Sequence, residues 1–274
     1  MVKLGWHFAT LALLIGATGC QSPTALKPAA RTHDWSCFEQ VNGGIIRGDK
    51  NRKAIAFSFT GHEFAEGGAT ILDELQKHRA KGSFFLTGNF LANPAFQPLI
   101  RRIATEGHYF SAHSDAHLLY CSWDKDRQTL VTQAQFTSDL KRNFQRFKEL
   151  KLTQPPGRYF IPPFEHFNSQ IVAWAKQMGV TLINYTPGTR SHADYTGEAD
   201  RNFTSSAAIF DSIVKREQSN PHGLNGFILL LHLGSGPVRT DKFHVRFGEL
   251  LDHLAAQGYE FVRVDELLKP TANP

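Results

Sequence analysis

The sequence predicts an α/β fold, built as one barrel of parallel strands surrounded by helices. Short apolar runs alternate with segments of helical spacing between residues 53 and 264. Apolar strands with helices between them are typical of a parallel sheet that helices cover. The strand-type runs form about seven β/α units, and that number over about 220 residues suits a barrel better than an open sheet.

Each element follows from its own pattern. The predicted strands are 53–59, 82–87, 108–112, 158–161, 181–185, 226–231 and 260–264, and the last but one is entirely apolar. The predicted helices are 69–79, 96–106, 136–150, 170–178, 206–218 and 247–257, where apolar residues recur every three or four positions. Pro98 favours a helix start near residue 96, and Gly179 and Gly258 favour helix ends.

The N-terminus has the layout of an export signal. Lys3 gives a basic start, residues 8–15 are apolar, and small residues lead to Cys20. The apolar run is too short to span a membrane. The residues before Cys20 resemble a bacterial lipoprotein cleavage site, although Ala17 stands where leucine is usual, which leaves simple secretion open. We therefore predict a lipoprotein-type signal at 1–20, a flexible tether at 21–35 and a catalytic domain at 36–270.

Charge and composition limit the partners. The formal net charge is +5, and the basic residues are scattered rather than clustered. This pattern argues against a nucleic-acid partner. Contact with a membrane is expected only through a lipid on Cys20, and the sequence does not give an oligomeric state.

In a barrel of this kind the active site lies at the C-terminal ends of the strands. The residues to examine are therefore 60–63, 87–89, 113–117, 162–166, 186–190 and His232. His113 and His117 are four residues apart and can share a metal on one helical turn, although both can equally be surface or core histidines. His232 ends the most apolar strand, which suggests a general acid or base, or else a core histidine bonded to a carbonyl.

Four segments in order resemble the polysaccharide deacetylase family, carbohydrate esterase family 4, also called the NodB homology domain. They are FSF at 57–59 with KGSFFLTG at 81–88, EGH at 106–108 with HSDAH at 113–117, FIPPF at 160–164, and LLLH at 229–232. The resemblance covers most of residues 53–265 and is most specific at 113–117. It implies a distorted seven-stranded (β/α) barrel, a metal at His113 and His117, and an N- or O-acetylated glycan as substrate.

The first motif of that family, T-F-D-D-G, is absent. Its two aspartates, a base and a metal ligand, fall on Thr60 and Gly61. His62 and Glu63 follow at once, and both residue types can serve as base or as ligand. The arginine of the third motif, which holds the base in the family, is Ile161 here. Two residues just past that motif, at 165 and 166, are further candidates for the missing function, and a degenerate site is the alternative.

Weaker signals surround these motifs. The aromatic residues Tyr120, Trp123 and Phe164 can stack on sugar rings or simply pack. The segment 184–195 can line a sugar groove or be structural. Asp115 can orient a metal ligand, but we expect a solvated loop acid.

The resemblance and the residues together predict metal-assisted hydrolysis of an acetyl group at the cell envelope. Glu63, His113 and His117 are the predicted ligands, His62 (or Glu165) the base, and His232 the acid that protonates the leaving amine. Zinc is the predicted metal, with cobalt, nickel or iron as alternatives. The competing function is a catalytically degenerate module that binds glycan.

Overall fold

The computed structural model describes residues 1–2 and 37–269 of the chain. The predicted signal and tether fall almost wholly on residues 3–36, outside the described residues. Within the part of the chain that the structure describes, no helix is long and apolar enough to cross a membrane.

The predicted strands and helices occur in the predicted order, and further elements are added before residue 54, after residue 86 and after residue 261. The strands are β1 (Glu39–Val41), β2 (Gly44–Arg47), β3 (Ala54–Gly61), β4 (Ser83–Leu86), β5 (Tyr109–Ala112), β6 (Tyr159–Phe160), β7 (Thr181–Leu182), β8 (Phe227–His232) and β9 (Glu260–Phe261). The α-helices are α1 (Gly68–Lys77), α2 (Gly88–Ala92), α3 (Gln97–Thr105), α4 (Gln133–Glu149), α5 (Ser169–Gln177), α6 (Ser206–Ser219), α7 (Phe247–Ala256) and α8 (Val264–Leu267). Short 3-10 turns are η1 (Pro94–Phe96), η2 (Pro163–Glu165), η3 (Ser191–Ala193) and η4 (Phe243–Arg246).

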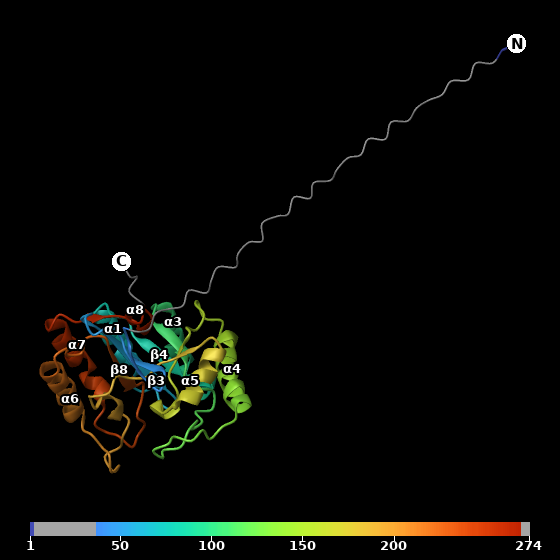
Figure 1. Ribbon diagram of the computed structural model, residues 1–274. Coiled ribbons are helices and arrows are strands. Elements are labelled where there is room, and N and C mark those ends of the chain that lie inside the picture. The colour runs from blue at the N-terminus through green and yellow to red at the C-terminus, as the bar shows by residue number, and fades with distance from the viewer. Residues whose placement is uncertain (3–36, 270–274) are drawn as a thin grey trace. The chain divides into compact units, whose positions relative to one another are not determined.

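The main sheet has the order β1-β2-β8-β3-β4-β5, with β9 paired to the start of β3. Its central strands β8, β3, β4 and β5 are parallel, whereas β1, β2 and β8 pair antiparallel. The parallel pair β6–β7 lies between β5 and β2. Gly157 N–H donates to the carbonyl of Phe110 in β5, and Asn184 N–H donates to the carbonyl of Ile45 in β2. Helices lie around the outside of these strands (Figure 1). The strands therefore curl around one another, in agreement with the predicted distorted barrel.

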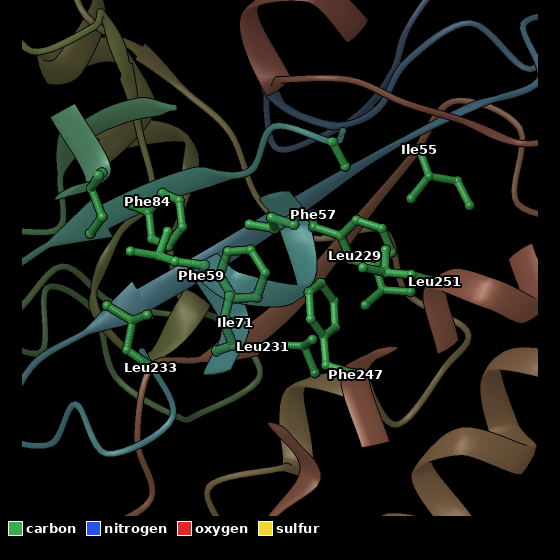
Figure 2. Close-up of a cluster of buried hydrophobic side chains, with 14 of the residues drawn as sticks. Ile55, Phe57, Phe59, Ile71, Phe84, Leu229, Leu231, Leu233, Phe247 and Leu251 are labelled. Atoms are coloured by element: carbon green, nitrogen blue, oxygen red, sulfur yellow. The ribbon is translucent and has the colours of Figure 1, made fainter. Parts of the chain in front are cut away.

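Strand alternation decides which side chains reach the helices. Ile55, Phe57 and Phe59 of β3 lie in one buried cluster with Phe247 of α7, and Figure 2 shows them side by side. The Phe57 and Phe247 rings meet edge to face at 5.2 Å. Because successive side chains of a strand point to opposite faces, Thr60 faces the barrel interior. The same alternation turns the last residue of β8, His232, toward that interior.

Two early elements were not predicted. The hairpin β1–β2 turns at Asn42 and Gly43, whose φ values are 49° and 84°. Asn-Gly is the residue pair that a two-residue hairpin favours, so the signal was present in the sequence. Helix α2, also unpredicted, begins after Thr87, whose side chain accepts a hydrogen bond from Phe90 N–H. Helix α4 begins earlier than predicted, because Thr132 and Gln135 form a capping box.

Helix α4 fixes the loop that follows β5. The carboxylate of Asp139 is fully buried and accepts hydrogen bonds from the hydroxyls of Ser114 and Tyr120, both at 2.6 Å. One turn later, the Asn143 side chain accepts from the His113 N–H at 3.1 Å and donates to the last carbonyl of β4. Two side chains of one helix thereby set the path of residues 113–117.

We expect Asp139→Ala to lower the free energy of unfolding by about 3–5 kcal/mol, because it leaves several buried donors without an acceptor. Urea denaturation measures the change. Asp126→Ala is the control: Asp126 accepts one exposed hydrogen bond from Gln128, so its loss should cost less than about 0.5 kcal/mol. Equal unfolding midpoints for the two variants would show that Asp139 does not hold this loop.

Candidate metal centre

A cavity of about 430 Å³ opens where β3, β5 and β8 end. Its lining brings together the predicted residues Thr60, His62, Glu63, His113, His117, Glu165 and His232. The other lining residues are Phe64, Trp123, Phe164, Tyr195, Asp200, Gly234, Ser235 and Val238. A larger groove, of about 1020 Å³, lies along α4 and α5 and contains none of the predicted site residues. The smaller cavity is therefore the candidate site.

His113 and His117 present neutral imidazoles to this cavity. The Nδ1–H of His113 donates to the carbonyl oxygen of Ile161 at 2.8 Å, which leaves Nε2 as the atom that can bind a metal. Burial and then the neighbouring His117 hold the pKa of His113 well below its ordinary value. Burial, with His62 and His232 adding to it, lowers the pKa of His117 to about 3. Both imidazoles are therefore neutral at neutral pH, and the neutral imidazole is the form that coordinates metal.

The two histidines converge without a helical turn, which corrects the prediction for this segment. Ser114 and His117 have positive φ values of 76° and 54°. The Ser114 hydroxyl accepts a hydrogen bond from the His117 N–H at 3.0 Å and thereby holds this tight loop. The ring centroids of His113 and His117 are 5.1 Å apart. The sequence spacing predicted that the rings would meet, but not the backbone that brings them together.

His62 lies inside the cavity, whereas Glu63 is largely exposed. The His62 ring stacks on the His117 ring at 4.3 Å and 15°, and its Nδ1 hydrogen-bonds with the Thr87 hydroxyl at 3.1 Å. Burial lowers the pKa of His62, and the charge of Glu63 opposes this shift. The Glu63 side chain is 66% exposed, and its carboxylate lies 3.8 Å from His62 Nε2. His62 is thus in place for proton transfer or ligation.

The two positions of the family's missing aspartates differ, and the one at Gly61 is closed to a ligand by its apolar neighbours. A Cβ atom on Gly61 would lie 3.0 Å from each of three apolar side chains, Leu86, Phe90 and Leu233. An aspartate there would bury its charge among hydrocarbon groups. Thr60 does line the cavity, and its buried hydroxyl has no hydrogen-bond partner among the described residues. The departure from the family motif is therefore built into the packing.

Glu165 is the buried carboxylate of the site. Its side chain is 11% exposed, and its Oε1 lies 3.9 Å from His113 Nε2. Burial raises the pKa of Glu165 to about 7; the positive charge of His232 opposes this shift, and the negative charge of Asp194 adds to it. The Glu165 carboxyl group can therefore gain or lose its proton near neutral pH.

His232 is held by an acid that the sequence did not single out. Its Nδ1–H donates to Asp194 Oδ1 at 2.6 Å, and its backbone N–H donates to Asp194 Oδ2 at 2.9 Å. Burial would lower the pKa of His232, but the carboxylate outweighs burial and raises it. Asp194 lies in the segment 184–195, for which the sequence left a structural or a groove role open. Asp194 and His232 are far apart in the sequence, and no local pattern predicted that they would pair.

The secondary candidates occupy different places in the structure. Asp115 is not a solvated acid: it is buried and accepts hydrogen bonds from Arg142 and Arg146 of α4. Tyr120 is fully buried, so it cannot stack on a ligand. The Nε2–H of His166 donates a hydrogen bond to the Ser122 carbonyl oxygen at 2.8 Å, and its ring stacks on Trp123 at 4.3 Å. The exposed aromatic side chains Phe64, Trp123, Phe164 and Tyr195 all line the cavity.

The donor set of this cavity suits a divalent metal. Two neutral imidazoles and carboxylates are the ligands of catalytic zinc sites, and Glu165 Oε1 is a buried oxygen without a hydrogen-bond partner among the described residues. Across residues 1–2 and 37–269, no group of three or more His, Cys, Asp or Glu side chains is already drawn together in a metal-binding arrangement. The types of donor in the cavity therefore fit a metal, although among the described residues no three of them are drawn together.

Known proteins share this sequence and fold. A family model described as polysaccharide deacetylase matches residues 47–183. A peptidoglycan-N-acetylglucosamine deacetylase of Bacillus cereus is 29% identical over 220 residues, which cover 80% of this chain and 90% of that protein. A peptidoglycan-N-acetylmuramic acid deacetylase of Bacillus subtilis is 28% identical over 225 residues, which cover 81% of this chain and 73% of that protein.

Solved structures agree in fold. A family 4 carbohydrate esterase pseudoenzyme from Bacillus anthracis matches with a TM-score of 0.64 at 18% identity, over 84% of this chain and 70% of that chain. The predicted NodB-type α/β fold is confirmed by this likeness. From its matched residues and its fold, the chain belongs to the polysaccharide deacetylase family.

Proposed function

We propose that this protein is a metal-dependent hydrolase that removes acetyl groups from an N- or O-acetylated glycan of the cell envelope. The observation that carries the proposal is the convergence of two neutral imidazoles, His113 and His117, and an Asp194-held His232 on one cavity. The exposed aromatic rings around that cavity are the surface that sugar rings stack on. Export, with a lipid on Cys20, is part of the proposal and places the protein beside such a polymer.

Each residue then has a task in the hydrolysis. His113 and His117 would hold the metal, with zinc first and cobalt, nickel or iron as alternatives. A bound metal supplies polarisation of the acetyl carbonyl and activation of water. His62 accepts the proton of the attacking water, or Glu165 does so. His232, kept protonated by Asp194, donates a proton to the leaving amine or hydroxyl of the sugar.

A glycan-binding module without activity is the second candidate. The absence of an acid at Thr60 and Gly61 favours it, and a pseudoenzyme occurs among the proteins of this fold. It predicts glycan binding through the exposed aromatic residues, without hydrolysis.

Acetate release separates the two functions. With zinc and N-acetylated chitooligosaccharides or peptidoglycan, we expect turnover that EDTA abolishes and that His113→Ala lowers by roughly 100-fold or more, because the metal contributes several kcal/mol. His222→Ala, which changes an exposed histidine outside the cavity, should leave turnover unchanged. Bound metal and glycan without any acetate would support the binding module instead.

The Asp194–His232 pair predicts a pH effect. The Asp194 carboxylate raises the pKa of His232, so Asp194→Asn leaves burial, the largest effect, which lowers this pKa against only the smaller opposing charge of Glu165. A general acid has to be protonated; the alkaline limb of the kcat/KM profile should therefore move to lower pH, and kcat/KM at neutral pH should fall roughly tenfold or more.

The profile and an NMR titration of His232 are the measurements for this pair. Asp211→Asn, an exposed change on α6, is the control and should leave the limb in place. An unmoved limb in Asp194→Asn would rule out His232 as the acid.

A further inference from the structure

We propose that Glu165, rather than Glu63, is the carboxylate that completes the metal centre. This inference rests on the proposed function, which assigns the metal to His113 and His117. A catalytic zinc site has three protein ligands and an open position, so one further donor is required. The candidates are the acids of the cavity wall near the two histidines.

The distances between donor atoms favour Glu165 as the third ligand. Two donor atoms that each lie about 2.1 Å from one zinc ion can be at most about 4.2 Å apart. Glu165 Oε1 is 3.9 Å from His113 Nε2, which is the nitrogen that the Ile161 carbonyl leaves for the metal. The contact of the Glu63 carboxylate is instead with His62 Nε2, at 3.8 Å.

Burial points the same way. Glu165 Oε1 has no hydrogen-bond partner among the described residues, although its side chain is only 11% exposed. A buried carboxylate oxygen without a donor is costly, and a cation is one of the few groups that can satisfy it. Glu63 is 66% exposed, so water already solvates it.

The backbone is shaped to deliver this carboxylate. Phe164 and Glu165 have consecutive positive φ values of 59° and 52°, a backbone conformation that is unfavourable for residues other than glycine. The Asn184 side chain holds the turn by donating to the Glu165 carbonyl at 2.6 Å. The same segment also supplies the Ile161 carbonyl that orients His113. The strained stretch from Ile161 to Glu165 thus orients the His113 ring and places the Glu165 carboxylate opposite its Nε2 atom.

The assignment leaves His62 for proton transfer. Its ring lies flat against the His117 ring, at 4.3 Å and 15°, and its Nδ1 is engaged with the Thr87 hydroxyl. Glu63, 3.8 Å from His62 Nε2, then acts on that ring rather than on the metal.

Zinc titration of the full chain tests the assignment without requiring turnover. Metal-free wild type, Glu165→Gln, Glu63→Gln and His113→Ala are titrated with Zn²⁺ by calorimetry, and with Co²⁺ by visible absorption. We expect Glu165→Gln to weaken zinc binding roughly 100-fold or more and to change the Co²⁺ spectrum. Glu63→Gln should stay within roughly threefold of wild type, because its carboxylate is not a ligand.

A folding control accompanies the titration. In EDTA, urea denaturation should find Glu165→Gln at least as stable as wild type, because an amide replaces a buried acid that lacks a donor. Wild-type zinc affinity in Glu165→Gln, or an equal loss in Glu63→Gln, overturns the assignment while the metal centre stands. Failure of wild type to bind zinc, or unchanged affinity in His113→Ala, overturns the proposed metal centre together with it.

Discussion

The parallel pairing of β3 with β8 and β4, and of β4 with β5, is the constraint on which the rest of the site depends. In this register Thr60 lies opposite His232, and the ends of β4 and β5 lie level with the end of β3. Parallel strands bring their carboxyl ends to one edge. The groups that follow these strands therefore meet, although long stretches of chain separate them.

Packing on the outer face of β3 explains why the site departs from the family motif. The apolar side chains of Leu86, Phe90 and Leu233 close around Gly61, so the family's aspartate has no room there. Hydrophobic burial at this point stabilises the barrel and removes a metal ligand at the same time. An acid from another strand end can compensate, since the barrel delivers several loops to one cavity.

Much of this arrangement could be read from sequence. The apolar residues of 53–59 and 226–231 predicted the central strands. Because active sites of such barrels lie at the C-terminal ends of the strands, His113, His117 and His232 were expected at one cavity, where the structure places them. Hydrogen-bonded pairs between residues of distant loops could not be predicted from the sequence. Nothing in the local sequence links Asp194 to His232, because loop conformation sets that contact. The exposure of Glu63 and the burial of Glu165 likewise depend on tertiary packing, which periodicity does not encode.

The proposed metal centre is held by two histidines of the β5 loop and an acid from beyond β6. Anomalous diffraction at the zinc absorption edge, on crystals of the zinc-loaded protein, can locate the metal and its ligands. We expect one peak at about 2.0–2.2 Å from His113 Nε2, a His117 ring nitrogen and a Glu165 carboxylate oxygen. A peak bound by Glu63 in place of Glu165, or no peak between the two histidines, would contradict it.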